Sequence, residues 1–280
     1  MFNTFDRMAE ALRLVCEEVP GPEVLAYLPG WEGRYYRSYP QYAPGPDLGG
    51  PAGFDRLRSV AADLGVHLMP MFGVHGVHVA QYPDWERAAF RSRSDRRVVG
   101  VNEPDWDGDR APEDDQVFCN PGVPAFRAHL TAQVRRLLVD HPVDGVFLDT
   151  SACWFNDPRA NLLAGYRALL DDLRGTHPDV LFAGEGWFDA LLALFPVNQS
   201  WLGTDRVMRV PELMTRFARG LGHLSAPAPG SGSTGVHENG WGAPTAAAAV
   251  GGHVATVSVV GDTLTDHADA LRAACRAALG

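Results

Sequence analysis

Four short runs of this sequence are apolar along their whole length, and a stretch with helical periodicity separates each run from the next. Runs that are apolar throughout, rather than at alternate positions, are typical of parallel strands buried on both faces of a sheet. We therefore expect an α/β fold in which helices cover the sheet. The predicted strands are 23–29, 66–74, 143–150 and 178–186, and the predicted helices are 54–65, 124–141 and 160–177.

A sheet of this kind can be open and doubly wound, or closed into a barrel. A doubly wound nucleotide-binding sheet carries a glycine-rich phosphate loop after its first strand. Here the corresponding segment, YLPGWEGRYYRSYPQY at 27–42, is aromatic and bulky. A closed barrel of about 250 residues fits the 280 residues of this chain as one domain spanning 1–280. We therefore predict a single (β/α)8 barrel of the TIM type.

The strand pattern becomes weaker in two places. Irregular strands are expected near 97–102 and 198–209. Apolar runs that resemble strands resume at 235–241 and 254–262, after a flexible loop. Part of the barrel is therefore expected to be irregular or incomplete.

The charge balance limits the partners that this chain can have. The chain has 24 basic residues, all of them arginine, against 34 acidic residues, and its net charge is −10. A surface of this charge repels polyphosphate, so nucleic acid and anionic membranes are not expected partners. No apolar run approaches about 18 residues and no signal-peptide pattern is visible, so we expect a soluble, cytoplasmic protein. The four scattered cysteines are expected to be reduced thiols.

Charged residues stand at the ends of three apolar runs. Asp149 ends GVFL, Glu185 follows VLFAG, and His237 with Glu238 follows TGV. In an α/β barrel the catalytic groups occupy the carboxyl ends of the strands. A carboxylate at such a position must face solvent, a partner or a ligand, because desolvation without one is costly. A structural interpretation also exists for each: Asp149 as a turn cap, and Glu185 as the partner of an arginine.

Asp149 and Glu185 end consecutive predicted strands, and this adjacency constrains their separation. Neighbouring strands lie about 4.8 Å apart, so two carboxylates at their ends can flank one bond at the roughly 5 Å separation of a retaining glycosidase. In that mechanism one carboxylate attacks the anomeric carbon, while the other protonates the leaving oxygen and then activates water. The pattern favours glycoside hydrolysis that requires no cofactor and no metal.

Aromatic residues recur at the same strand ends and suit a sugar ligand. Their flat faces can stack on the apolar face of a pyranose, and polar neighbours can bond its hydroxyl groups. The expected partner is an oligosaccharide or a glycoside. The expected substrate-binding residues are Trp31, Arg34, Tyr36, His75, Trp154, Asn156, Asp157, Trp187, His237, Glu238 and Trp241.

The segments GVFLDT and FAGEG resemble the nucleophile and acid/base strands of retaining α-glycosidase barrels, in the broad α-amylase-like group that includes endo-α-N-acetylgalactosaminidases. The resemblance implies that Asp149 is the nucleophile at the end of the fourth strand and that Glu185 is the acid/base at the end of the fifth. MPMFGVH resembles the preceding strand, and His237 resembles a later-strand histidine that contacts substrate. The resemblance covers roughly residues 24–260 and implies a hydrolase of carbohydrate metabolism.

Other interpretations of the sequence remain open. Glu103 of the tripeptide NEP is the acid/base candidate of a β-retaining glycosidase, and a non-catalytic carbohydrate-binding barrel is a third hypothesis. The acidic loop DWDGDRAPEDD at 105–115 alternates aspartates as cation loops do, but it departs from the EF-hand pattern. His67, His75 and His78 lack a carboxylate or cysteine at metal spacing, so no zinc site is expected.

Overall fold

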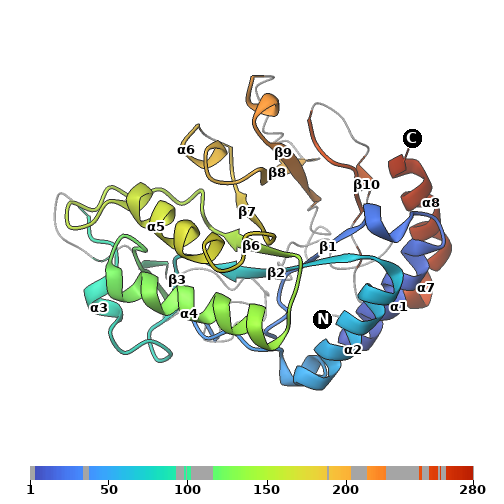
Figure 1. The fold of residues 1–280 in the computed structure, drawn as a ribbon, viewed down its shortest axis with the longest axis horizontal. Coiled ribbons are helices and arrows are strands. Elements are labelled where there is room, and N and C mark those ends of the chain that lie inside the picture. The colour runs from blue at the N-terminus through green and yellow to red at the C-terminus, as the bar shows by residue number, and fades with distance from the viewer. Residues whose placement is uncertain are drawn as a thin grey trace, which may run out of the picture.

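A curled sheet of six parallel strands forms the centre of the molecule (Figure 1). The computed structural model describes residues 4–33, 38–92, 98, 100–101, 116–187, 189–202, 213–224, 246–247, 252–257, 259 and 263–279. Within these residues the strand order is β1-β2-β6-β7-β8-β9, and every neighbouring pair is parallel. The strands are β1 Leu25–Leu28, β2 His67–Gly73, β6 Gly145–Asp149, β7 Leu181–Glu185, β8 Val197–Leu202 and β9 Arg219–Leu224.

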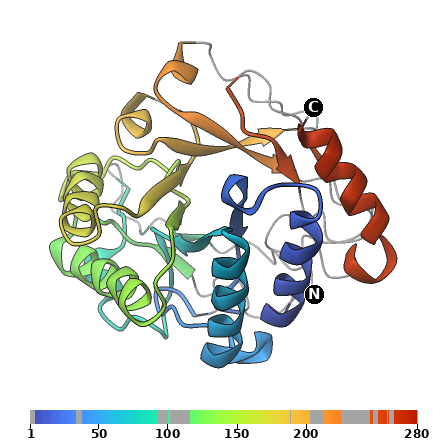
Figure 2. The same ribbon diagram turned by 45° about the vertical axis from the view of Figure 1, so that its right-hand side comes forward.

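Helices surround this sheet on its outer side, as Figure 2 shows. The five long helices are α1 Phe5–Cys16, α2 Gly50–Leu64, α4 Pro124–Asp140, α5 Leu162–Arg174 and α8 Ala268–Leu279. The short helices are η1 Gly21–Glu23, η2 Pro46–Leu48, α3 Trp85–Ala88, α6 Asp189–Leu192, η3 Met214–Arg216 and α7 Thr263–Asp266. Within the described ranges, none of these helices has both the length and the apolar character that a bilayer crossing requires.

The register of the sheet brings the carboxyl ends of its strands to one edge. Gly73 of β2 pairs with Asp149 of β6, and Leu148 pairs with Gly184 of β7. Glu185 in turn pairs with Gln199 of β8. Since the strands are parallel, the segments that follow them all begin on the same side of the molecule.

The chain continues past β9 along the same sheet edge. The N–H of Gly220 in β9 donates to the carbonyl of Gly252, and the N–H of Val254 donates back to the carbonyl of Gly220. A small antiparallel hairpin of β10 Ala246–Ala247 and β11 Thr256–Val257 lies beside this segment. Gly220 and His253 thus form a parallel bridge, which extends the sheet beyond β9.

The ring of outer helices closes where α8 packs beside α1, which itself packs beside α2. The guanidinium of Arg272 on α8 donates to Glu17, just after α1, at 2.7 Å. Arg276 pairs in the same way with Glu18. The buried residues of α8, Leu271 and Cys275, face this junction from one side of an amphipathic helix.

A second, smaller sheet interrupts the barrel between β2 and α4. Its antiparallel strands are β3 Gly76–His78, β5 Gln116–Phe118 and β4 Gly100–Val101, in that order. The strand expected near 97–102 therefore belongs to this insertion rather than to the barrel. Its side chains join the main core through Val77 and Val117, both of which are buried.

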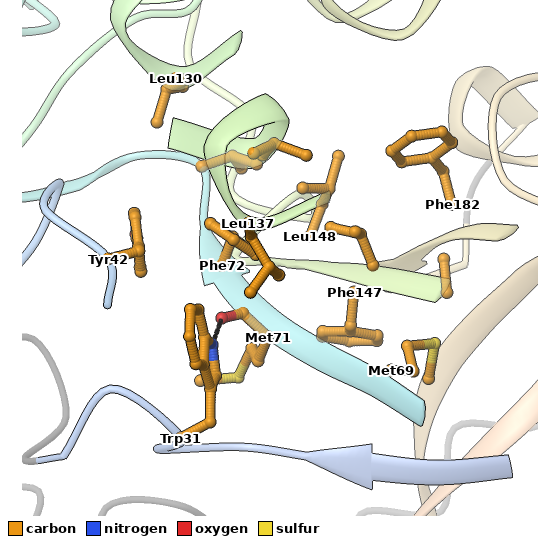
Figure 3. Close-up of a cluster of buried hydrophobic side chains, with 14 of the residues drawn as sticks. Trp31, Tyr42, Met69, Met71, Phe72, Leu130, Leu137, Phe147, Leu148 and Phe182 are labelled. Atoms are coloured by element: carbon orange, nitrogen blue, oxygen red, sulfur yellow. Dashed lines mark hydrogen bonds between the residues drawn. The ribbon is translucent and has the colours of Figure 1, made fainter. Parts of the chain in front are cut away.

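The core is one continuous cluster that links the sheet to the helices (Figure 3). Apolar residues of α4, such as Leu130 and Leu137, belong to it together with Phe72 and Phe147 of the sheet. All four cysteines are free thiols, as predicted.

Each of the four strands and three helices expected from periodicity corresponds to an observed element. Most of the predicted end residues lie within two residues of the observed ones. The main exception is α2, which begins at Gly50, four residues before the expected start at 54. β9 was not predicted. The expected strand at 235–241 lies outside the described residues, and only Thr256–Val257 of the expected strand at 254–262 is described as a strand.

Candidate active site

Asp149 and Glu185 end the adjacent strands β6 and β7, as the sequence predicted. Their preceding residues, Leu148 and Gly184, are register partners in the parallel ladder. Asp149 is 3% exposed, and Glu185 is half-buried. Two carboxyl groups are therefore held on neighbouring rigid elements at one edge of the sheet.

Thr150 connects the two carboxyl positions through its backbone. Its φ angle of 60° is left-handed, which is unfavourable for a β-branched residue. In this conformation its N–H donates to Oε2 of Glu185 at 2.9 Å. The residue that follows Asp149 therefore fixes the carboxyl group of Glu185.

Ser151 fixes the backbone of Glu185. Its Oγ accepts the N–H of Glu185 at 2.7 Å and donates to the carbonyl of Glu185 at 3.1 Å. Ser151 is fully buried, so water does not compete for these bonds. Strands β6 and β7 are thus tied together beyond the end of their ladder.

His75 is bonded inside the protein through both ring nitrogens, which corrects its expected role as a substrate contact. Nδ1 lies 3.0 Å from the carbonyl of Cys119 and donates to it, so Nε2 accepts from the hydroxyl of Tyr166 at 2.6 Å. Burial lowers the pKa of His75 to about 4, and the neutral ring fits this pattern. The Tyr166 hydroxyl also lies 3.3 Å from the carbonyl of Ser151, behind the site.

Trp31 is a second correction, because it belongs to the core rather than to a sugar-stacking surface. Its side chain is fully buried, and its Nε1–H donates to the carbonyl of Met71 at 2.7 Å (Figure 3). Its ring packs on Phe54 and Phe72 with centroid separations of 5.5 and 5.6 Å. No face of the indole is available to a ligand.

Asp157 is a third correction. It is buried and accepts hydrogen bonds from the backbone and the guanidinium of Arg159, which lies 2.7 Å away at its closest. Although burial opposes ionisation, these bonds from Arg159 hold the pKa of Asp157 below its ordinary value. Asp157 therefore forms a structural ion pair with Arg159. The sequence pattern cannot distinguish this role from ligand binding.

Three expected binding residues lie near the strand ends, two of them exposed and one half-buried. Trp154 is 36% exposed and packs at 6.1 Å on Tyr166, and Asn156 is exposed. Trp187 is half-buried, and its Nε1 has no hydrogen-bond partner among the described residues. The remaining expected residues, Arg34, Tyr36, Glu103, His237, Glu238 and Trp241, lie outside the described residues.

Glu32 is a buried acidic residue near Asp149 that the sequence analysis did not single out. It lies four residues beyond β1 and is 6% exposed, and the charge of Asp149 acts on it. The segment that contains it, PGWEG, was interpreted only as an aromatic loop. The available signal was an acidic residue among apolar neighbours with a glycine on either side of the pair Trp31–Glu32.

Burial and the charge of Asp149 determine the ionisation of the site. Burial first, and the negative charge of Asp149 second, raise the pKa of Glu185 to about 8, although the N–H of Thr150 favours its charged form. The pKa of Glu32 is also raised to about 8, mainly by burial. Burial raises the pKa of Cys153 to about 12, so this neighbouring thiol is not a nucleophile at neutral pH.

Among the described residues, no group of three histidine, cysteine, aspartate or glutamate side chains is placed to hold a metal ion. His67 bonds Asp144 at 3.0 Å, and Nδ1 of His78 accepts from the N–H of Ala80. The acidic loop at 105–115 lies outside the described residues.

Solved structures of several α-glycosidases are similar to this chain at low sequence identity. An α-N-acetylgalactosaminidase of Bifidobacterium bifidum has a TM-score of 0.61 and 15% identity, over 78% of this chain and 38% of that chain. An α-galactosidase of Thermus thermophilus has a TM-score of 0.53 and 17% identity, over 80% and 40%. A maltogenic α-amylase of Thermotoga neapolitana has a TM-score of 0.50 and 12% identity, over 70% and 44%.

This chain thus matches less than half the length of each of these structures. No protein-family model and no curated protein matches the sequence. The likeness is therefore one of architecture, and it extends over most of this chain. The chain has the barrel-type fold of these glycosidases.

Proposed function

We propose that this chain is a glycoside hydrolase that cleaves an α-glycosidic bond with retention of configuration, with Asp149 as nucleophile and Glu185 as general acid/base. One observation carries the proposal: two carboxyl groups end adjacent strands, and the N–H beside Asp149 donates to Glu185. The fold shared with α-glycosidases supports it.

In the first step the carboxylate of Asp149 attacks the anomeric carbon. The bond from that carbon to the leaving oxygen breaks, and the leaving oxygen takes the proton of Glu185. A raised pKa suits this role, because the acid still holds its proton at neutral pH. The product of the step is a glycosyl ester of Asp149.

In the second step Glu185 is a carboxylate and acts as the base. It takes a proton from water, whose oxygen attacks the anomeric carbon and releases Asp149. The bond from Thr150 N–H stabilises Glu185 in this charged form. The same group therefore favours the state that the acid reaches after it has given up its proton.

The substrate class that fits best is an α-linked pyranoside. The similar structures are named as an α-N-acetylgalactosaminidase, an α-galactosidase and a maltogenic α-amylase. On this chain, Trp154 and Asn156 follow β6 and are exposed, so they are the described side chains placed to contact such a ring or its aglycone.

The test is a panel of p-nitrophenyl α-glycosides of galactose, N-acetylgalactosamine and glucose, with the matching β-glycosides. We expect turnover of an α-glycoside, with the α-anomer as the first product in a proton NMR time course. Asp149→Asn should lower kcat/KM by about 1,000-fold or more. Glu185→Gln should lower it by about 100-fold to 10,000-fold on substrates with a poor leaving group.

Two controls and one rescue make the test specific. Asp140→Asn and Glu10→Gln change exposed carboxylates on α4 and α1 and should leave activity unchanged. Azide should restore turnover of the p-nitrophenyl glycoside by Glu185→Gln, because azide attacks without a base. Turnover of β-glycosides alone would instead favour the hypothesis built on Glu103. Sugar binding without any turnover would favour a carbohydrate-binding barrel.

A further inference from the structure

The backbone around Glu32 is held rigidly at the end of β1. Gly30 and Gly33 have left-handed φ angles of 64° and 108°, and the N–H of Gly33 donates to the carbonyl of Gly30. The carbonyl of Trp31 accepts the N–H of Gly45 at 2.9 Å. A Cβ atom on Gly45 would lie 2.8 Å from the backbone nitrogen of Gly33, so the two segments pack without side chains between them. The position of Glu32 is therefore determined by the fold.

The carboxyl group of Glu32 is buried without a charged partner among the described residues. Both carboxyl oxygens are inaccessible to solvent, and neither has a partner with acceptable geometry. Its own backbone N–H and then the Tyr39 hydroxyl favour the charged form, but burial outweighs both and raises the pKa of Glu32 to about 8. A buried polar group without a partner destabilises a fold, so packing alone does not account for a glutamate at this position.

The surroundings of Glu32 connect it to the strand ends that carry the candidate catalytic pair. The hydroxyl of Tyr42 donates to the carbonyl of Gly73 at 2.9 Å, and the charge of Glu32 acts on Tyr42. The ring of Tyr39 lies against Gly73, where a Cβ atom would come within 2.4 Å of it. Gly73 is itself the register partner of Asp149. Glu32, Tyr39, Tyr42 and Asp149 thus form one cluster, which we call the β1–β6 carboxyl cluster.

The structural carboxylate of Asp157 has an arginine partner, Arg159. Glu32 shows none within the described part of the chain. The neutral carboxylic acid offers both a donor and an acceptor, which is the combination that can bond a sugar hydroxyl or two neighbouring hydroxyls. From these observations we infer that Glu32 is a specificity-determining residue, and that it binds a hydroxyl group of the same sugar unit that Asp149 attacks. This inference rests on the proposed function.

The test combines Glu32 variants with deoxy substrates. The parent is the p-nitrophenyl α-glycoside that the wild-type protein cleaves best, and each analogue lacks one ring hydroxyl. Glu32→Ala should lower kcat/KM on the parent by roughly 10-fold, because one hydrogen bond between neutral groups contributes about 1 kcal/mol. On the one analogue that lacks the contacted hydroxyl, the same variant should have no effect. Glu10→Ala, on the exposed face of α1, is the matched control.

Thermal unfolding separates a ligand role from a structural role. If Glu32 stabilised the fold, Glu32→Gln would lower the melting temperature, whereas the ligand role predicts that it rises. Glu32→Gln removes a group whose ionisation opposes folding, so at pH 9 its melting temperature should exceed that of the wild type by roughly 3 °C or more. Glutamine keeps a donor and an acceptor at this position, so a Glu32→Gln variant that is more stable, together with a Glu32→Ala variant that is less active on the parent substrate, supports a ligand role. A Glu32→Gln variant with a lower melting temperature at pH 9 would overturn the inference, as would an equal loss of kcat/KM on every deoxy analogue.

Failure of the proposed function gives a separate result. If the wild-type protein cleaves none of the glycosides, binding of galactose, N-acetylgalactosamine and glucose is measured by calorimetry. Binding to the wild type that is lost in Glu32→Ala and kept in Glu10→Ala supports Glu32 as a ligand residue without catalysis. Binding that Glu32→Ala leaves unchanged, or no binding at all, overturns the inference.

Discussion

Replacing Glu185 by glutamine should remove a large part of the dependence of stability on pH. In the unfolded chain Glu185 ionises near its ordinary value of 4.5, and in the folded protein its pKa is raised to about 8. Between these values the folded protein holds a proton that the unfolded chain has released. The free energy of unfolding therefore falls as pH rises. The contribution is complete below the unfolded pKa and is lost as pH rises through the folded pKa.

The size of this effect follows from the difference between the two pKa values. Each pH unit in this interval changes the free energy of unfolding by about 1.4 kcal/mol. From pH 5 to pH 8 the wild-type protein should lose about 3 to 5 kcal/mol through Glu185. Glutamine has nearly the same shape and does not ionise. Asp149 remains in the variant, and so does Glu32, whose raised pKa adds a loss of the same sign to both proteins.

Urea unfolding at pH 5, 6, 7 and 8, followed by far-ultraviolet circular dichroism, measures the effect. At each pH the unfolding free energy of the wild type is subtracted from that of Glu185→Gln. This difference should become more positive from pH 5 to pH 8. Glu10→Gln, an exposed change on α1, should follow the wild type. Two curves that stay parallel within about 1 kcal/mol would refute the argument that burial and Asp149 keep Glu185 protonated.

Four further outcomes are expected. Because Glu185 must hold its proton in the first step, kcat/KM should fall as pH rises through about 8, and a fall confined to pH below 6 would contradict this. Ser151→Ala removes both Oγ bonds to the backbone of Glu185 and should lower kcat and reduce stability by about 1–3 kcal/mol in urea unfolding. Gly73→Ala places a Cβ atom 2.4 Å from the ring of Tyr39 and should cost about 1–3 kcal/mol and alter the near-ultraviolet dichroism. Arg272→Ala breaks a partly exposed ion pair and should change the unfolding free energy by less than about 1 kcal/mol.

Sequence periodicity predicts where strands end but not which way the residues beyond them point. Asp149 and Glu185 were predictable because each is the last residue of a strand that is apolar throughout. Trp31 and His75 also follow strands, yet both turn inward and are fully buried. The turn geometry that decides this depends on contacts such as the bond from Trp31 to Met71, 40 residues away in the sequence.

Several strands could not be predicted from the pattern of apolar residues. The strands β3, β4 and β5 span two or three residues each, too few for alternation or a continuous apolar run to be recognised. Strand β9 contains two glycines in RGLGHL, which lower its strand propensity. Glu32 was missed for a related reason, since it lies in a turn, where residue type carries no period.

The packing of α1 against α8 also has a consequence for the order in which the protein folds. Arg272 and Glu17 are 255 positions apart in the sequence, so α1 meets α8 only after all the segments between them have been made. Until then α1 can pack against α2 but not against α8. Contacts between such distant segments form late and slow the search for the native state. The contact between α1 and α8 is therefore expected to form late in folding. Partial unfolding of the native protein should begin at the same contact.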